Sequence, residues 1–206
     1  MSSGPDRYES NWASTLGHPC FRYLYLKRTA PKLEIISEEK KALFKKGCEL
    51  EEVVINEFKK DGFEIIELQK KFELKELKIV GKIDCIIRYR ELEYPCEIKS
   101  VSENLWGKIY TYNDFLNSSY YYIRMYPLQL QLYLYATSKE SGYFYLRNKI
   151  TSSGRFVKVK FDNEMVKDAF DKAKKINKYV DENILPAKIS DLSICEDCGF
   201  YNYCYK

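Results

Sequence analysis

The sequence predicts an α/β fold in which a central mixed sheet is flanked by helices. Two long segments have the apolar spacing of amphipathic helices, and the spacing between them changes to that of strands. The resulting order of helix, several strands, helix, two strands and helix is typical of a sheet covered by helices. The 206 residues, 45% of them hydrophobic, can bury one sizeable core. We therefore expect a single domain over residues 1–206.

The N-terminal third is expected to become helical after an irregular start. Residues 1–15 are polar and without a period, so we expect them to be flexible. The segment 21–27 alternates aromatic and basic residues, which indicates a short helix. Ser37 is in the N-cap position of a long amphipathic helix over 38–58, which ends before Asp61 and Gly62. The apolar positions of this helix are Ala42, Leu43, Leu50, Val53, Val54 and Phe58.

Strand-like alternation begins after Gly62 and predicts a meander over 63–68, 71–77, 79–89 and 92–99. Residues 104–122 have no clear period and include Gly107, so we expect a mobile loop with short helical pieces. The remaining elements are a helix over 127–139, strands over 142–147 and 155–161, and a lysine-rich amphipathic helix over 163–183.

Composition excludes several classes of function. The 34 basic and 30 acidic residues give a formal charge of +4, which permits an anionic partner without requiring one. No signal-like segment or run of eighteen apolar residues is present, so we expect a soluble, cytoplasmic protein without a membrane partner. The single histidine, His18, leaves little material for a Ser-His-Asp or Cys-His mechanism. No Gly-x-x-x-x-Gly-Lys loop occurs, so any unwinding of a nucleic acid would come from a partner protein.

Two predicted strands carry acids among apolar residues. Asp84 lies in the first strand, and Glu97 and Lys99 lie in the next. Residues two apart in a strand face the same way, so Glu97 and Lys99 project together while Ile98 points to the opposite layer. If the two strands pair, Asp84 meets Glu97. Two carboxylates form a hard oxygen site for Mg²⁺ or Mn²⁺, and a lysine beside them steadies the attacking water or the phosphate charge. This combination indicates phosphodiester hydrolysis.

A second candidate metal site is built from cysteines. Three of them follow the pattern C-x2-C-x5-C near the C-terminus, a spacing typical of metal ligands: Cys195, Cys198 and Cys204. Cys20 is the candidate fourth ligand, and we expect His18 beside it or at the surface. The other cysteines lie among apolar residues and are expected in the core: Cys48, Cys85 and Cys96. From spacing alone, four thiolates suit zinc and an iron–sulfur cluster equally well.

Four short motifs occur in a fixed order along the chain: Gly47-Cys-Glu-Leu-Glu51, Asp84, Glu97-Ile-Lys99 and Gln129-Leu-Gln-Leu-Tyr133. Together they resemble the RecB-like and Cas4-like branch of the PD-(D/E)XK nucleases, over the range from Cys20 to Cys204. The resemblance implies a restriction-endonuclease-like core over 37–161. Many Cas4-like proteins have His where this chain has Glu51, so the match is to the glutamate-bearing subset.

The resemblance also implies roles for individual residues. Glu51 would complete a Mg²⁺ or Mn²⁺ shell with Asp84, Glu97 and the backbone carbonyl of Ile98. Gln129 and Tyr133 would orient Lys99 or a phosphate. Two alternatives stay open: Glu52 in place of Glu51, and Gln131 with Tyr135 as the fourth motif. The family places one cysteine before the core and three after it, which implies a [4Fe-4S] cluster on Cys20, Cys195, Cys198 and Cys204, with Zn²⁺ as the alternative.

The expected activity is that of a metal-dependent DNA exonuclease, with endonuclease action as an addition, on single-stranded DNA or DNA ends. Partners of the family type would be a helicase, a recombination protein or a CRISPR-adaptation protein. Lys108, Tyr122 and Arg124, in the tyrosine-rich region before Pro127, are the candidate DNA contacts, although such tyrosine stripes are more often packing. The competing functions are a non-catalytic DNA-binding or assembly module and a structural zinc-ribbon adaptor.

Overall fold

The computed structural model describes residues 9–205, apart from the side chain of Cys48. Within this range six strands form one sheet, and they are β1 (Asn11–Trp12), β2 (Glu64–Leu74), β3 (Ile79–Tyr89), β4 (Leu92–Val101), β5 (Ser141–Asn148) and β6 (Gly154–Lys160). The order is β1-β3-β4-β5-β6, with β2 paired to β3. The β1–β3 and β4–β5 pairs are parallel and the other pairs are antiparallel, so the sheet is mixed as predicted.

Strand β3 has three neighbours, and two of them share one edge. β2 pairs with β3 from Arg88 to Ile79 and occupies one edge along its whole length. On the other edge, β4 pairs with the end of β3 as far as Cys85, and β1 pairs only with Ile79 and Val80. Residues 81–84 therefore have no strand neighbour on this edge. Asp84 lies in this open stretch of β3.

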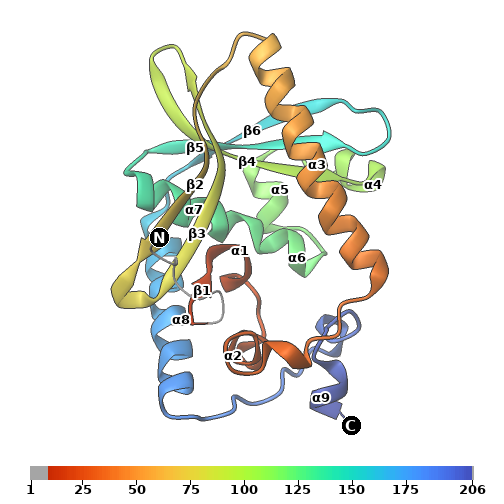
Figure 1. Ribbon diagram of the computed structural model, residues 1–206, viewed down its shortest axis with the longest axis vertical. Coiled ribbons are helices and arrows are strands. Elements are labelled where there is room, and N and C mark those ends of the chain that lie inside the picture. The colour runs from red at the N-terminus through yellow and green to blue at the C-terminus, as the bar shows by residue number, and fades with distance from the viewer. Residues whose placement is uncertain (1–8, 206) are drawn as a thin grey trace.

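Helices cover both faces of the sheet (Figure 1). In the described residues they are α1 (Ala13–Leu16), α2 (Phe21–Thr29), α3 (Glu38–Lys60), α4 (Glu103–Trp106), α5 (Tyr112–Leu116), α6 (Tyr121–Arg124), α7 (Tyr126–Thr137), α8 (Asn163–Asp181) and α9 (Tyr201–Tyr205). Short 3-10 turns occupy Pro31–Leu33, Lys75–Leu77 and Leu192–Ile194. Helix α3 packs on one face through Val54 and Phe58, and α7 packs on the other through Leu130 and Leu134.

The alternation of β4 places its side chains in these two layers. Cys96 and Ile98 pack in the cluster beneath α3, and Val101 packs in the cluster beneath α7. Glu97 and Lys99 occupy the alternate positions, so they project toward α7. This arrangement follows from the two-residue period of a strand, and it directs both charged side chains into an otherwise apolar layer.

Residues 9–15, for which the sequence predicts a flexible segment, include a short strand with a long-range pairing. Asn11 and Trp12 pair with β3, and Ala13 is completely buried. The reason is a contact with residues 68 positions later in the chain, which no local pattern reveals. Residues 1–8 lie outside the described part of the chain, as does the side chain of Cys48, for which we expect a place in the core.

Two further details differ from expectation. Residues 64–68 and 71–74 of the two predicted segments lie in one strand, β2, because an irregularity near Glu67 and a left-handed residue, Gln69, bend the chain without ending its pairing. Residues 75–77 form a 3-10 turn. On α3 the predicted apolar residues Leu43 and Val53 are 51% and 49% exposed. Only the second half of the helix lies against the sheet, and no element of residues 9–205 covers Leu43 on the first half.

The segment 104–122 contains α4, α5 and the residues leading to α6. Leu105 and Phe115 are buried in the main core. The guanidinium of Arg155 lies between the rings of Trp106 and Tyr110, 4.1 and 4.0 Å from their centroids, and it donates to the Trp106 and Ile109 carbonyls. These contacts fasten the segment to β6.

The beginning and end of the described chain pack together. Tyr25, Leu26 and Phe200 form a small apolar cluster, and the Ile35 N–H donates to the Gly199 carbonyl at 2.9 Å. A side chain at position 199 would collide with Glu34 and with the Ile35 carbonyl, so this close approach requires glycine. No helix in residues 9–205 is both long and apolar enough to cross a membrane.

Candidate active site

Asp84 and Glu97 lie together where β3 and β4 separate. The ladder between the strands ends at Cys85 and Cys96, and the next residues are Asp84 and Glu97. Beyond this point the Ile98 N–H has no backbone acceptor on β3. It donates to Oδ2 of the Asp84 side chain instead, at 2.8 Å. The open edge of β3 thus becomes a site in which a carboxylate faces the backbone of β4.

Glu97 is 2% exposed, and its two oxygens have different surroundings. Oε1 accepts from Lys99 Nζ at 2.5 Å and from Gln129 Nε2 at 2.7 Å. Oε2 is buried and has no hydrogen-bond partner among the described residues. A buried carboxylate oxygen without a donor is unfavourable unless a proton or a cation occupies the vacant direction.

Burial raises the pKa values of both acids in this site. Burial, with the charge of Asp84, raises the pKa of Glu97 to about 8. Burial also raises the pKa of Asp84, although Lys99 acts in the opposite direction. For Lys99, burial disfavours the ammonium, but Glu97, Tyr126 and Asp84 outweigh it and raise the pKa above its usual value. Two carboxylates against one ammonium leave the site with an excess of negative charge when all three are ionised.

This donor set fits Mg²⁺ or Mn²⁺. Both ions prefer carboxylate, carbonyl and water oxygens, and Mg²⁺ is commonly held by one or two carboxylates together with waters. Asp84 and the free oxygen of Glu97 supply the carboxylates. Because a strand residue directs its N–H and C=O toward the same neighbour, the Ile98 carbonyl faces the β3 side together with the N–H that contacts Asp84.

Glu51 approaches this pair from α3 without joining it. Its carboxylate accepts from Gln69 Nε2 of β2, and burial together with the charge of Asp84 raises its pKa to about 7. No three His, Cys, Asp or Glu side chains of the described residues are arranged to hold one metal ion. Ligation by Glu51 therefore stays a prediction. Glu52, the alternative, is exposed and lines an open hollow between α3 and β2.

Helix α7 supplies the residues that hold Glu97 in place. Gln129 Nε2 lies 2.7 Å from Glu97 Oε1 and 2.6 Å from the Tyr133 hydroxyl, which donates to the Lys82 carbonyl at 2.9 Å on the open edge of β3. One turn earlier, the Tyr126 ring lies 4.7 Å from Lys99 Nζ. Residues spaced by three and four share one face of a helix. Tyr126, Gln129 and Tyr133 therefore lie on the face of α7 that is directed toward the carboxylate site.

The alternative fourth motif, Gln131 with Tyr135, faces another part of the molecule. Gln131 donates to the Lys160 carbonyl and accepts the Asp162 N–H, so it joins β6 to the start of α8. Tyr135 is exposed and packs against Phe170 of α8. The structure therefore brings Gln129 and Tyr133, and not this second pair, to Glu97.

Three neighbours of the site were not among the sequence candidates. Tyr126 was detectable, because it precedes Gln129 by three residues on the same helix face. The positive charge of Lys82 opposes the rise in the pKa values of Glu51 and Asp84, and an alternating strand pattern gives no sign of this influence. Gln69 contacts Glu51 only because β2 is irregular at that point.

The candidate DNA contacts lie on the segment before α7. Lys108 is exposed, and Arg124 donates to the Ser118 carbonyl at 2.5 Å. Tyr122 is exposed and packs against Tyr120, and burial, followed by the nearby Tyr126, raises its pKa. Tyr126, whose charge contributes to this shift, contacts Lys99.

The four predicted cluster cysteines surround one small cavity between the start of α2 and the C-terminal segment. The lining includes Cys20, Cys195, Cys198 and Cys204. All four are free thiols, and burial and then the charges of the other three raise the pKa of Cys198. Four thiols around an apolar cavity suit a soft metal group. Cys85 and Cys96 are instead completely buried in the core, as expected.

His18 lies beside the cysteine cavity and not at the surface, because it is 5% exposed. Its Nδ1 accepts the Cys20 N–H at 3.1 Å, and its ring stacks on Tyr23 at 4.0 Å. Burial and the charge of Lys172 lower its pKa to about 4. The ring is therefore neutral at neutral pH and acts as an acceptor that orients the loop before α2.

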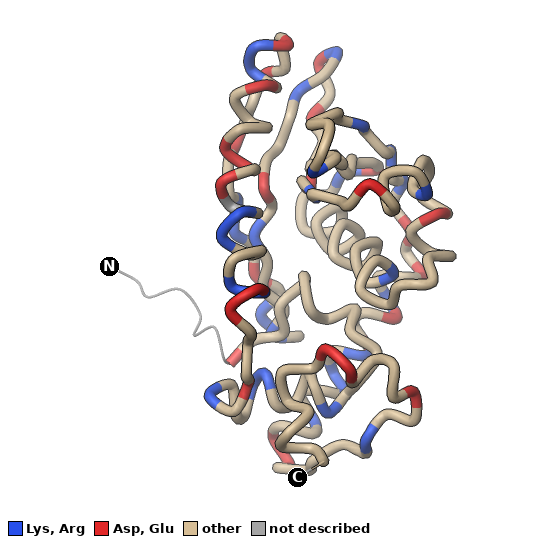
Figure 2. The backbone as a smooth tube through the Cα atoms, turned by 90° about the vertical axis from the view of Figure 1, so that its right-hand side faces the viewer, with Lys and Arg blue, Asp and Glu red and all other residues tan. Residues whose placement is uncertain are grey.

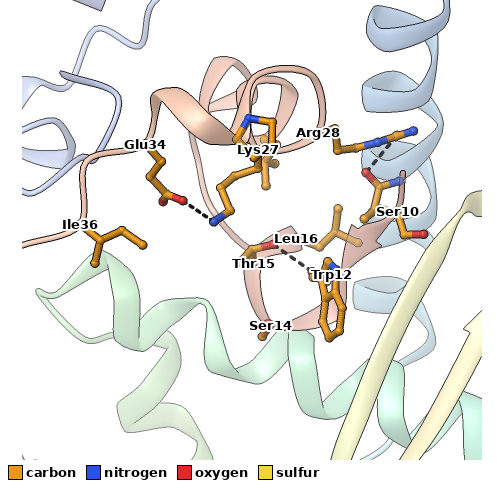
Figure 3. Close-up of a pocket in the computed structure, with 12 residues that line it drawn as sticks. Ser10, Trp12, Ser14, Thr15, Leu16, Lys27, Arg28, Glu34 and Ile36 are labelled. Carbon is orange, nitrogen blue, oxygen red and sulfur yellow. Dashed lines mark hydrogen bonds and ion pairs between the residues drawn. The ribbon is translucent and has the colours of Figure 1, made fainter. Parts of the chain in front are cut away.

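A separate cavity of about 240 Å³ lies between the N-terminal residues and α2 (Figure 3). Lys27 and Glu34 form an ion pair across it at 2.6 Å, and Trp12, Thr15 and Arg28 contribute other parts of the wall. None of the carboxylates of the candidate active site borders this cavity. It is a feature of the junction between β1, α1 and α2.

Several solved protein structures share this architecture. The protein SSO0001 is similar over 98% of this chain and 88% of its own, with a TM-score of 0.61 and 16% identity. An alkaline exonuclease from Laribacter hongkongensis, LHK-Exo, is similar over 86% of this chain and 91% of its own, with a TM-score of 0.59 and 14% identity. The same exonuclease in complex with dAMP gives a TM-score of 0.60 at 13% identity. No protein-family model and no curated protein sequence matches the chain.

At these identities the likeness concerns the fold. This chain shares the mixed sheet with helices on both faces with LHK-Exo, and the predicted α/β fold with a central mixed sheet flanked by helices is confirmed.

Proposed function

We propose that this chain is a metal-dependent DNA nuclease that hydrolyses phosphodiester bonds, acting as an exonuclease with some endonuclease action on single-stranded DNA or free ends. The observation that carries the proposal is the Asp84–Glu97 pair, in which one buried Glu97 oxygen has no partner while Lys99 and Gln129 hold the other. The exonuclease identity of the structural neighbour LHK-Exo, and its complex with dAMP, support a substrate made of nucleotides.

Each residue has a chemical part in this proposal. Asp84, Glu97 and the Ile98 carbonyl would hold Mg²⁺ or Mn²⁺, with Glu51 reaching it directly or through water. A divalent ion in such a site lowers the pKa of a bound water and neutralises phosphate charge. Lys99 offers its ammonium to the attacking water or to a phosphate oxygen. Gln129 and Tyr133 hold Glu97, so that its second oxygen stays directed into the site.

The cysteine cavity is proposed to hold a [4Fe-4S] cluster, with Zn²⁺ as the alternative. The four thiols surround one cavity, and four thiolates can hold either a cubane or a zinc ion. The resemblance to Cas4-like nucleases favours the cluster. A site of this kind would stabilise the contact between the start of α2 and the C-terminal segment.

The test is a cleavage assay on end-labelled single-stranded and double-stranded DNA, with and without Mn²⁺. Asp84→Ala and Glu97→Ala should abolish cleavage while the circular dichroism spectrum is unchanged. Lys99→Ala should retain the metal but lower turnover by roughly 100- to 1,000-fold, because its part is stabilisation of charge. Full activity in Asp84→Ala would refute the site. Binding of DNA without cleavage by the unmodified protein would identify a non-catalytic DNA-binding module instead.

A further inference from the structure

The cavity between β1, α1 and α2 has a lining of mixed character. Its volume of about 240 Å³ exceeds that of a cavity that holds benzene, about 150 Å³, and is below the roughly 300 Å³ at which pockets for drug-sized ligands begin. Part of the lining is apolar, and it includes the buried Leu16 and Leu24. Figure 3 shows Lys27 and Arg28 reaching the cavity from α2, with Trp12 on the facing segment. Such a lining suits a small molecule with an apolar body and a charged group.

Arg28 forms no ion pair with an acidic side chain of the described residues. Its Nη1 lies 2.5 Å from Asn177 Oδ1 and 3.4 Å from Asn11 Oδ1, and both of these acceptors are neutral amides. Its Nε is buried and has no acceptor in the described part of the chain. Burial lowers the pKa of Arg28, and the more distant charges of Asp181 and Glu9 offset this effect only in part. Because a buried cation without an anion is unfavourable, Arg28 is suited to binding an anion.

The free side of this guanidinium favours a particular shape of anion. Nη1 is occupied by the two amide oxygens, so Nε and Nη2 are the nitrogens without a partner among the described residues. These two nitrogens lie on one edge of the planar group and can donate in parallel to the two oxygens of a carboxylate. The partly buried position of Arg28 strengthens such a pair, because less water competes for it.

The other charged residues of the cavity limit the charge of its ligand. Lys27 and Glu34 pair with each other at 2.6 Å, so Arg28 supplies the one net positive charge of the described lining. A single carboxylate balances this charge. A phosphate monoester carries about −1.5 to −2 at pH 7, and its additional charge would lie near the Glu34 carboxylate. The lining therefore favours a monoanion.

The surroundings of the cavity favour a small anion over a polyanion. Helix α2 lies in the lower part of the molecule, and Figure 2 shows basic and acidic residues interspersed along the chain there. Nucleic acids are held by several cations that follow the phosphates of a strand. The described lining of the cavity offers one cation without an acidic partner. The carboxylates of the candidate active site do not border the cavity.

We propose that this cavity binds a small carboxylic acid with an apolar body, whose carboxylate pairs with Arg28 while the body packs between Trp12 and the two leucines. The site is separate from the Asp84–Glu97 pair, so it goes beyond the proposed nuclease function and does not depend on it. The ligand contacts β1, α1 and α2 together, whereas β1 is paired with β3 through two residues only. Binding therefore stabilises the junction of these three segments.

The ligand class is tested by isothermal titration calorimetry with three carboxylates of increasing size: benzoate, phenylacetate and indole-3-acetate. The titrations contain EDTA, so that no divalent ion can hold a carboxylate at the candidate active site. At least one of the three should bind, and its amide, which is neutral and nearly the same shape, should bind about 10-fold or more weakly. A hundred-fold excess of the bound acid over its Kd should raise the melting temperature by about 5–10 °C.

The position of the ligand is tested by two variants, each with a control. Arg28→Lys keeps the charge but removes the parallel donors, and it should weaken binding by about 10- to 100-fold. Arg22→Lys is its control, because Arg22 lies on the same helix and its Nε donates to the Pro186 carbonyl outside the cavity. Since Arg28→Lys also alters a contact with Asn177, the second variant is Ser14→Trp, which fills the cavity from α1 and should abolish binding. Its control, Ser14→Ala, should bind as the unmodified protein does.

Four results would overturn the proposal. They are the absence of heat with all three acids at millimolar concentration, equal affinity for an acid and its amide, tighter binding of phenyl phosphate than of the three acids, and unchanged affinity in folded Arg28→Lys or Ser14→Trp. The third result would assign the cavity to phosphate esters, and the fourth would place the ligand elsewhere. Absence of DNA cleavage by the unmodified protein would contradict only the nuclease proposal, because binding in EDTA does not involve the carboxylate site.

Discussion

Glu97 has one oxygen held by Lys99 and Gln129 and one buried oxygen without a partner, and this asymmetry determines how the site responds to pH. A carboxyl whose pKa is raised by burial holds its proton more tightly in the folded state than in the unfolded chain. Between the ordinary pKa of 4.5 and the raised value of about 8, the folded protein therefore binds more protons. Stability falls with rising pH under that condition.

We accordingly expect the metal-free protein to lose stability between pH 5 and pH 8. The change should be smaller in Glu97→Gln, which cannot ionise at this position. Urea unfolding in EDTA at several pH values measures both. Added Mg²⁺ should restore stability at pH 8 in the unmodified protein and not in the variant, because binding of a cation requires the ionised pair. Identical pH profiles for the two proteins would show that Glu97 is not the group responsible.

At the scale of elements, α7 is the support of the site, because Gln129 and Tyr133 form a chain from Glu97 to the Lys82 carbonyl. In Tyr133→Phe two buried hydrogen bonds are lost, which should lower the free energy of unfolding by about 1–3 kcal/mol and reduce cleavage. Tyr135→Phe is the control on the same helix, since that side chain is exposed. Unfolding curves that coincide for these two variants would contradict the support assigned to Tyr133.

Most elements follow from local periodicity, and the exceptions have a common cause. The two-residue period predicted that Glu97 and Lys99 share a face, and the strand neighbourhood predicted that Asp84 lies near them. The period of α7 could not choose between Gln129 and Gln131, because the helix is apolar on nearly all sides and buries both. The period of α3 likewise could not predict that Leu43 is exposed. A period identifies a face of a helix but not whether another element lies opposite it.

For the whole molecule, the cysteine cavity joins parts of the chain about 175 residues apart, and its metal content is the decisive property. If a four-thiolate cubane is present, anaerobically purified protein should be brown and contain about four irons per chain. Serine at Cys20, Cys195, Cys198 or Cys204 should remove the colour and lower the melting temperature. Cys85→Ala should keep the colour, because that thiol lies in the core. One tightly bound zinc in colourless protein would replace the iron–sulfur assignment and keep the four-cysteine site.

This joining of distant segments was only partly visible in the sequence. The spacing of Cys195, Cys198 and Cys204 predicted a shared site, and the cavity brings Cys20 to them. The pairing of residues 11 and 12 with β3 was not predictable, since a two-residue strand is too short to show alternation. Its position is set by the sheet that the later part of the chain builds.

The open stretch of β3 also has a consequence for solubility. An unpaired strand edge is a template on which strands of other molecules can add, and proteins protect such edges by covering them. Here a side chain covers the edge. Between the ends of β1 and β4, the Tyr133 hydroxyl donates a hydrogen bond to the Lys82 carbonyl. Tyr133 therefore also keeps this edge from joining other chains, so damage to α7 exposes the protein to aggregation as well as to disruption of the Asp84–Glu97 site.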